Sequence, residues 1–206
     1  MYFLRFFLTF EVRTNVNGYS RELARLHINN INEGFLRSLG ISTLSNLYEA
    51  IARSKQSILV LGFEEEKLIG FAAGTDNMKD LYFQLLLSPS ALFSICMAIL
   101  RNPKAILKIF EIFTYSFSSK RKKSLPRAEL LSLCVDQKGR GRGLSALLYN
   151  ELCLLFEKMG VSSFVIVVGG ELEIANKFYS RMGAKIAGET EVHSTQQSNV
   201  YVHHLK

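Results

Sequence analysis

The fold is decided by the stretch LCVDQKGRGRGLSALL at residues 133–148. It reads as the end of an apolar strand, a glycine-rich turn and the start of an apolar helix. Gly141 and Gly143 let a ligand approach the backbone closely, and the helix presents free N–H groups and the positive end of its dipole. The turn therefore predicts an anion site, to which Arg140 and Arg142 would add charge-assisted hydrogen bonds. The alternative is a basic turn without a ligand, since short glycine motifs are weak evidence alone.

The chain around this stretch predicts an α/β (α+β) fold, with a mixed central β-sheet flanked by helices. Strands are expected at 10–13, 57–63, 67–73, 129–135, 163–168, 185–192 and 199–205. Helical spacing of apolar residues predicts helices at 20–35, 43–53, 144–159 and 174–182. At 206 residues the chain fits a single domain spanning 1–206.

Residues 79–127 depart from this pattern and are interpreted as a helical insertion before the strand at 129–135. The run 81–100 has no charged residue, the segment 104–117 has amphipathic helical spacing, and 120–123 is basic. A membrane crossing by 81–100 would separate strands of the same sheet, so packed or interfacial helices are expected instead. The insertion is expected to contact a membrane surface peripherally; a homodimer interface and a lid are the alternatives.

The net charge of +7 favours an anionic partner, such as a nucleotide cofactor, a phosphorylated intermediate or an anionic membrane surface. No nucleic-acid partner is expected, because charge is not accompanied by a recognition motif. The three cysteines lie in apolar runs without CxxC spacing, which predicts neither disulfides nor a metal site and favours a reducing, cytoplasmic compartment. Residues 1–10 are interpreted as leading into a first strand, since Arg5 interrupts them and they lack the features of a signal peptide.

Two motifs resemble the GCN5-related N-acetyltransferases, the GNAT family. Residues 140–145, RGRGLS, match the family's pyrophosphate loop, Arg/Gln-x-x-Gly-x-Gly/Ala, with Ser145 in the last place. Residues 175–184, ANKFYSRMGA, resemble its second signature, a helix that ends in Tyr-x-x-x-Gly-Phe. The family commonly has proline, an aromatic residue, asparagine and phenylalanine where this chain has Gln137, Gly139, Leu172 and Ala184. The two motifs together, with a strand between them, are more specific than either alone.

The resemblance implies that the chain binds acetyl-CoA as a co-substrate and uses no metal. Backbone N–H groups of a splayed strand near 133–135 would polarise the thioester carbonyl, and Tyr179 would protonate the departing thiolate. A phenol suits this role because its pKa lies near that of a thiol. The alternative for Tyr179 is a core aromatic at a helix end. The implied cofactor contacts are Leu133, Cys134, Val135, Arg140, Gly141, Arg142, Gly143, Leu144, Ser145 and Asn176.

Glu129 is the candidate general base, because it opens the strand that would present the thioester. A solvated strand-end carboxylate is the alternative, since a slip of one residue turns the side chain to the other face. His193, Ser198 and Tyr201 flank a polar loop in the last hairpin, which often borders the acceptor site in the family. They are candidates for substrate contact, with an ordinary polar β-turn as the alternative.

The expected activity is transfer of an acetyl group to a primary amine by direct attack. The expected acceptor is a small molecule, such as an amino sugar or a glycan precursor at a membrane surface. A protein or peptide acceptor is the first alternative, in which the insertion would form a groove. A non-catalytic coenzyme A-binding module is the second, and it would not need Tyr179. The cysteine usage favours a cytoplasmic protein, and the insertion favours peripheral contact at the membrane.

Overall fold

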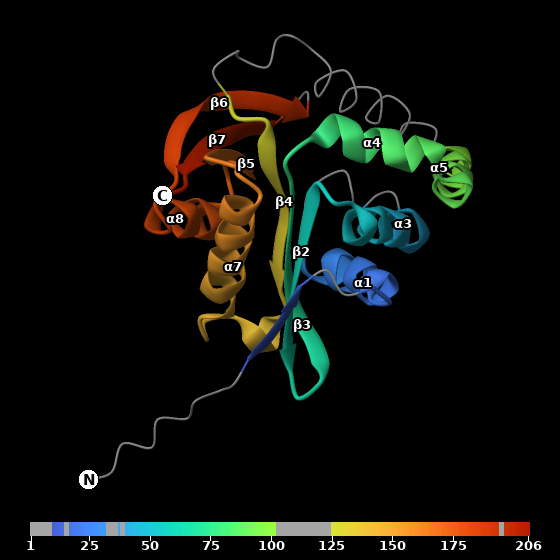
Figure 1. Ribbon diagram of the computed structural model, residues 1–206, viewed down its shortest axis with the longest axis horizontal. Helices are drawn as coiled ribbons and strands as arrows, with labels where there is room; N and C mark the ends of the chain where they lie inside the picture. Colours follow the sequence, from blue (N-terminus) through green and yellow to red (C-terminus); the bar gives the residue numbers. More distant parts are fainter. Residues whose placement is uncertain (1–9, 15–16, 32–36, 38–39, 102–124, 194–195) are drawn as a thin grey trace.

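The computed structural model describes residues 10–14, 17–31, 37, 40–101, 125–193 and 196–206 (Figure 1). Its strands are β1 (Glu11–Thr14), β2 (Ser57–Glu64), β3 (Lys67–Thr75), β4 (Ala128–Val135), β5 (Ser163–Gly169), β6 (Lys185–His193) and β7 (Gln196–His204). Its helices are α1 (Ser20–Asn30), α3 (Gly40–Arg53), α4 (Met78–Leu87), α5 (Pro89–Arg101), α7 (Leu144–Lys158) and α8 (Glu173–Arg181), with a 3₁₀ turn η1 (Gln137–Gly139).

These strands form one seven-stranded sheet, in the order β1-β2-β3-β4-β5-β7-β6. Neighbouring strands are antiparallel except β4 and β5, which are parallel and are connected through α7. The β2–β3 hairpin turns at Glu65 and Glu66, whose φ angles of 48° and 60° are those of a tight two-residue turn. The predicted mixed sheet flanked by helices is therefore confirmed.

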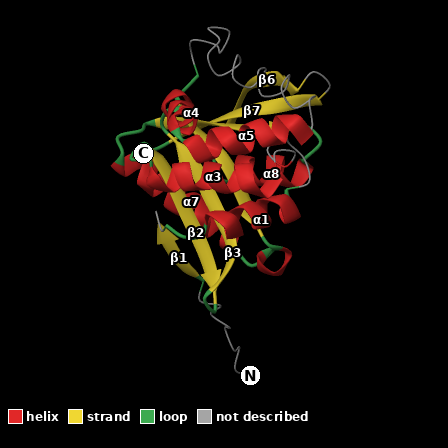
Figure 2. Cartoon of the chain, turned by 90° about the vertical axis from the view of Figure 1, so that its right-hand side faces the viewer, coloured by secondary structure: helices red, strands yellow, loops and turns green. Residues whose placement is uncertain are grey.

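The sheet is covered on both faces. Helices α1 and α3 pack on one face of β2–β4, and α7 packs on the other (Figures 1 and 2). Within β2 the burial alternates in the way that a pleated strand requires: Ile58 and Val60 face the α7 side, whereas Leu59 and Leu61 face α1 and α3. The strand is thus buried on both sides, which explains its nearly continuous apolar sequence.

Two helices, α4 and α5, occupy the first part of the predicted insertion. The axes of α4 and α5 differ in direction by 89°. No single helix in the described part of the chain is long and apolar enough to span a membrane. Taken together, the bent pair formed by Met78–Leu87 and Pro89–Met97 reaches that length and apolar composition. The amphipathic helix expected at 104–117 and the basic run at 120–123 lie outside the described residues, as does 1–9.

Some element boundaries differ from the predictions. The first helix ends at Asn30 instead of residue 35, because Ile31 is already extended, with φ −106° and ψ 98°. The last strand begins at Gln196 and not at 199, since the hairpin pairing reaches His193 and Gln196. Both differences extend or shorten an element at its end, where apolar periodicity carries little information.

Candidate cofactor-binding and catalytic site

Strands β4 and β5 diverge in the middle of the sheet. Their ladder ends where Leu130 pairs with Ile166, yet β4 continues to Val135 and β5 to Gly169. Among the residues that the structure describes, one edge of β4 beyond Leu130 therefore has no β-sheet partner on the β5 side. Since unpaired backbone N–H and C=O groups need partners, this edge can bind an extended ligand that carries amides of its own.

A β-bulge lies at the point of divergence. Gly74 of β3 pairs with Leu130, while its neighbour Ala73 pairs with Ser132, so Leu131 is an extra residue in β4. Leu131 packs against the core on the α1–α3 side, and Ser132 also reaches that side through Tyr48. The bulge thus turns two consecutive side chains to the same face and twists the strand where it leaves β5.

The turn after β4 presents backbone donors to one spot. Gly141 and Gly143 adopt left-handed φ angles of 73° and 89°, and a Cβ at either position would meet no atom within 4 Å. The open space beside both glycines admits a ligand to the backbone. No side chain of the described residues caps α7, so the N–H groups of its first turn remain available to an anion.

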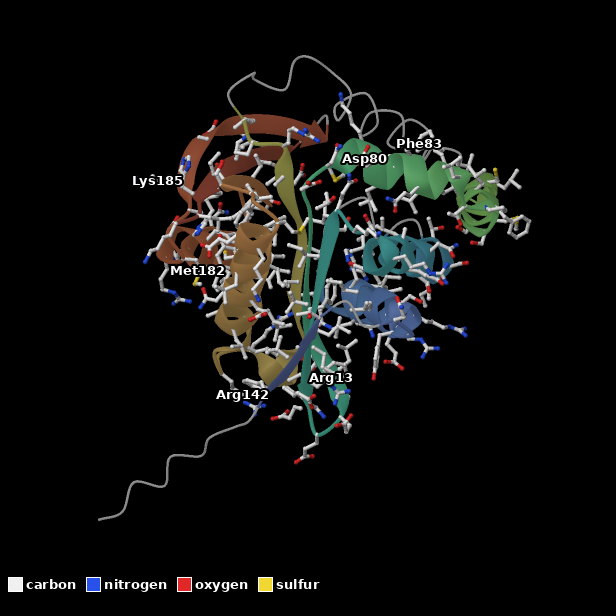
Figure 3. All side chains as sticks on the ribbon, viewed as in Figure 1. Arg13, Asp80, Phe83, Arg142, Met182 and Lys185 are labelled. Carbon is white, nitrogen blue, oxygen red and sulfur yellow. The ribbon has the colours of Figure 1, made fainter. Side chains whose placement is uncertain are left out.

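The side chains of the two arginines in the turn are held in place by hydrogen bonds and an ion pair with other residues of the chain. Arg140 donates from Nε to the carbonyl oxygen of Val135 at 3.1 Å, and its Nη2 lies 3.3 Å from Oδ1 of Asn30 at the end of α1. Arg142, which is labelled in Figure 3, forms an ion pair with Glu64 of the β2–β3 hairpin. Its Nε atom is buried without a protein partner in the described residues. Arg142 therefore keeps one donor available within a fixed guanidinium.

Asn176 ties the end of β5 to α8 and β7. Its Nδ2 donates to the carbonyl oxygens of Gly169 and Leu172, each at 2.9 Å. Its Oδ1 accepts hydrogen bonds from the hydroxyl of Tyr201 at 2.8 Å and from Nδ2 of Asn199 at 2.9 Å. The side chain that was predicted to contact the cofactor thus holds together the elements on the β5 side of the divergence, and Tyr201 belongs to the same network.

Tyr179 lies near the end of α8, on the α7 side of the sheet. Its ring packs against Tyr149 and Phe178, with centroids 5.9 and 5.2 Å away, and it is 7% exposed. Burial raises the pKa of the Tyr179 phenol above its ordinary value, so the group stays protonated near neutral pH. A protonated phenol is the form that an acid catalyst needs.

Glu129 lies at the other end of β4 from the turn, opposite Thr75 of β3 and Val165 of β5. Its neighbours Ala128 and Leu130 face the α7 side, so alternation along the strand turns Glu129 to the α1–α3 side. The side chain is half-buried. This carboxylate is one residue before the last pairing of β4 with β5, and therefore close in sequence to the divergence.

The remaining acceptor candidates lie on the last hairpin. Ser198 is buried opposite Gly169, at the end of β5, and Tyr201 is buried opposite Ile166, at the end of the β4–β5 ladder. His193 closes β6, and its side chain is outside the described residues. The structure brings the hydroxyl of Tyr201 into contact with Asn176, and the ring centroids of Tyr201 and Tyr179 are 6.5 Å apart, whereas Ser198 lies nearer the start of β7, opposite the end of β5.

A buried polar cluster escaped the sequence predictions. Nδ1 of His27 in α1 lies 2.6 Å from the hydroxyl of Tyr48 in α3, and Tyr48 in turn forms a hydrogen bond with Ser132 of the bulge. Cys134 is the next polar side chain on this face, and burial raises the pKa of its thiol to about 12. Nothing in the sequence links these residues, because they come from three elements and stand among apolar neighbours.

Comparison with known proteins agrees with this geometry. The model of the Acetyltransferase (GNAT) family matches residues 25–184. A search of curated protein sequences found no match. Among solved structures, the ribosomal-protein-S18-alanine N-acetyltransferase from Escherichia coli is 11% identical, with a TM-score of 0.61 and coverage of 96% of this chain and 95% of that chain.

Two further structures show the same fold. NAA60 from Arabidopsis thaliana, in complex with a bisubstrate analogue, is 13% identical, with a TM-score of 0.61 and coverage of 96% and 99%. An N-acetyltransferase from Staphylococcus aureus Mu50 is 17% identical, with a TM-score of 0.59 and coverage of 96% and 99%. The divergent β4 and β5, the glycine turn and the family match all point to the same conclusion: the chain belongs to the GNAT family of acetyl-CoA-dependent N-acetyltransferases.

Proposed function

We propose that this protein transfers the acetyl group of acetyl-CoA to a primary amine of a small molecule. The observation that carries the proposal is the continuity of the open edge of β4 with the uncapped start of α7. In acetyl-CoA the extended arm that carries the thioester is joined to a pyrophosphate, just as the open edge of β4 is joined to the start of α7. One continuous site can therefore bind the arm along β4 and the pyrophosphate at the helix, through backbone groups.

Donor binding is assigned to the residues on either side of the turn. The N–H groups of Gly141 and Gly143, with those of Leu144 and Ser145, would hold the pyrophosphate at the helix N-terminus. The edge of β4 from Leu133 through Cys134 to Val135 would bind the amides of the pantetheine arm. Arg140 and Arg142 supply positive charge from fixed positions. Asn176 lies on the β5 side of the divergence, where its hydrogen bond to Gly169 fixes the end of β5.

The chemical step requires one proton to leave the amine and one to reach the thiolate. Attack of the neutral amine forms the C–N bond and breaks the C–S bond of the thioester. Glu129, directly or through water, would accept the proton that the amine loses. Tyr179 would donate its phenolic proton to the departing sulfur. Backbone N–H groups of β4 beside the bulge would stabilise the oxyanion that forms between these events.

The proposed acceptor is the amine of a small molecule, and the alternative acceptor is the amine of a protein. The Escherichia coli neighbour acts, by its name, on an alanine of a ribosomal protein. We therefore compare initial rates of thiol release from acetyl-CoA with amino sugars, polyamines and a peptide that has a free N-terminal alanine. Faster turnover of an amino sugar supports the small-molecule proposal. Turnover of the peptide alone would contradict it, and no turnover by a protein that binds acetyl-CoA would favour a non-catalytic module.

The acceptor is further proposed to lie at a membrane surface. Helices α4 and α5 expose six large apolar side chains, with exposures from 40% to 74%: Phe83, Leu86, Leu87, Leu92, Phe93 and Leu100. Figure 3 shows Phe83 on α4. Residues 101–127 contain eight Lys or Arg and one Glu, so they account for the whole net charge of +7 and the rest of the chain is neutral. Apolar side chains followed by concentrated positive charge are typical of peripheral binding to anionic lipid.

The position of these helices connects the membrane to the chemistry. Thr75 pairs with Glu129, and α4 begins at Met78, only a short connection beyond β3. The exposed apolar surface therefore starts beside the end of β4 that carries the proposed base, while the glycine turn lies at the opposite end. A membrane-bound amine could approach from one end and the soluble donor from the other.

Sedimentation with vesicles tests this contact. The protein is expected to bind phosphatidylcholine vesicles that contain phosphatidylglycerol, and the double variant Phe83→Ser/Phe93→Ser is expected to lose most of this binding. Ile174→Ser is the matched control, because Ile174 is 87% exposed but lies on α8. Loss of dimerisation in the double variant, without any vesicle binding by the native protein, would instead identify the surface as a homodimer interface.

A further inference from the structure

The side chain of Arg142 joins the glycine turn, residues 136–143, to the β2–β3 hairpin. Both carboxylate oxygens of Glu64, the last residue of β2, accept hydrogen bonds from the Arg142 guanidinium, one from Nη1 at 3.2 Å and one from Nη2. Nη1 also donates to the carbonyl oxygen of Lys138, inside the turn, at 3.1 Å. A single guanidinium therefore connects the hairpin to the residues that precede Gly143.

This guanidinium is held in a defined position and plane. Glu64 binds it through two nitrogens, and such a bidentate contact fixes the orientation of the planar group as well as its distance. The ring of Phe10, just before β1, lies beside it, with the ring centroid 5.0 Å from Cζ. The side chains of Arg142 and Glu64 are 25% and 26% exposed, so the pair is partly shielded from solvent.

The two arginines of the turn differ in the charge of their partners. Arg140 donates to neutral oxygens of Val135 and Asn30, which leave its positive charge uncompensated. Glu64 compensates the charge of Arg142 and places a carboxylate near the site proposed for an anionic donor. Electrostatics alone would make this carboxylate unfavourable for the binding of a pyrophosphate. The pair favours donor binding only if the order that it gives to the turn outweighs this repulsion.

We propose that Glu64 is a positioning residue for donor binding, which acts through Arg142 and holds the glycine turn in the conformation that receives the pyrophosphate. The inference rests on the proposed donor site. A loop that becomes ordered only when a ligand binds lowers the affinity, because the lost conformational freedom costs free energy. A turn that is ordered before acetyl-CoA arrives avoids this cost.

The hairpin is a suitable anchor because it belongs to the same sheet as the donor strand. Strand β3 pairs with β4 as far as Gly70 and Val135, and the N–H of Asp136 continues this pairing with a 2.8 Å hydrogen bond to the carbonyl oxygen of Ile69. The start of the turn is therefore fixed by β3. Its later part is fixed by Glu64, from the end of β2.

The same hairpin contains a matched control. Glu66 accepts two hydrogen bonds from Nη2 of Arg13 in β1, at 2.8 and 2.9 Å. Figure 3 labels Arg13 and Arg142, which both lie at the hairpin end of the sheet. The Glu66 pair has the same chemistry as the Glu64 pair, but it joins the hairpin to β1 and not to the glycine turn. Glu66→Gln therefore removes a carboxylate from the hairpin without a change in the turn.

Calorimetric titration with acetyl-CoA tests the proposal. Glu64→Gln, which keeps the size of the side chain, is expected to raise the Kd about three- to fivefold, the effect of one partly exposed ion pair. Glu66→Gln is expected to leave the Kd unchanged. If Glu64 acted only through its charge, the effect would have the opposite sign, because the loss of a carboxylate would strengthen the binding of an anion. An unchanged or lower Kd in Glu64→Gln would therefore overturn the proposal.

A double-mutant cycle tests whether Glu64 acts through Arg142. In a chain that already carries Arg142→Gln, the substitution Glu64→Gln is expected to have no further effect on the Kd, because its partner is absent. An equal effect of Glu64→Gln in both chains would overturn the proposal. Absence of acetyl-CoA binding by the folded native protein would instead overturn the donor site, so the two failures are distinguishable.

Hydrogen exchange examines the turn without a ligand. The N–H groups of Gly139 and Arg140 donate to carbonyl oxygens within the turn, at 2.9 and 3.3 Å, so their exchange measures how often the turn opens. These amides are expected to exchange faster in Glu64→Gln than in Glu66→Gln and the native protein. Equal exchange in the three proteins would overturn the proposal. So would faster exchange throughout the domain with a lower Tm, which would indicate a general loss of stability.

Discussion

Acidification should destabilise this protein through His27. Burial lowers the pKa of this imidazole from 6.5 to about 4 in the folded chain, whereas the unfolded chain keeps a value near 6.5. The unfolded state therefore takes up a proton first as the pH falls, and stability is lost between about pH 6.5 and about pH 4. A pKa lowered by about 2.5 corresponds to about 3 kcal/mol of unfolding free energy, since one pKa unit is worth about 1.4 kcal/mol. Roughly 2.5 kcal/mol should be lost by pH 4.5.

Denaturant unfolding of the native protein and of His27→Asn measures this effect. The asparagine in this variant would keep a hydrogen bond to Tyr48 but cannot be protonated, so carboxylates that titrate in the same range act equally on both proteins. The unfolding free energy of the native protein should fall relative to that of the variant from pH 7 to pH 4.5, by about 2.5 kcal/mol. Parallel pH curves for the two proteins would refute the claim that His27 is buried in its neutral form.

Three further substitutions probe the site. Gly139→Ala should lower the unfolding free energy by about 1–3 kcal/mol, and with it Tm, because the Cβ of the alanine would lie 2.9 Å from Cγ1 of Val135. An unchanged Tm would mean that the turn shifts to accommodate the methyl group. Tyr179→Phe should lower kcat by about 10²-fold or more while the Kd for acetyl-CoA stays constant, and native kcat in this variant would remove Tyr179 from the mechanism. Glu129→Gln should lower kcat and remove the acidic limb of its pH profile; a retained limb would assign the base to another group.

The elements of the fold could largely be predicted from the sequence, because apolar runs and apolar periods mark most of them. The continuous apolar run of β2 follows from burial on both faces of the sheet, and the four-residue spacing in α7 follows from burial on one face of a helix. The 89° bend between α4 and α5 could not be predicted in this way. The run 81–100 has no charged residue to mark a solvent face, so its apolar spacing does not define where Ser88 and Pro89 divide it.

The site was predictable where a single segment defines it. Gly141 and Gly143 lie in one segment with the strand before them and the helix after them, so the sequence alone predicts a ligand-binding turn. Their positive φ angles are those that glycine adopts readily, as the turn requires. The contacts of Arg142 with Glu64 and of Asn176 with Tyr201 join segments that are far apart in sequence. Only the folded sheet brings such partners together, and the same is true of the residues that connect α1 and α3 to the bulge.

The most direct test of the account is calorimetric binding of acetyl-CoA to the native protein and to the double variant Gly141→Glu/Gly143→Glu. Each glutamate would occupy the open space beside the turn and place a negative charge where the pyrophosphate is proposed to bind. The native protein is expected to show saturable binding with one site per chain, together with a rise in Tm, and a folded double variant is expected to show neither effect. Absence of binding at millimolar acetyl-CoA by the folded native protein, or equal binding by the variant, would contradict the assignment of the glycine turn as the donor site.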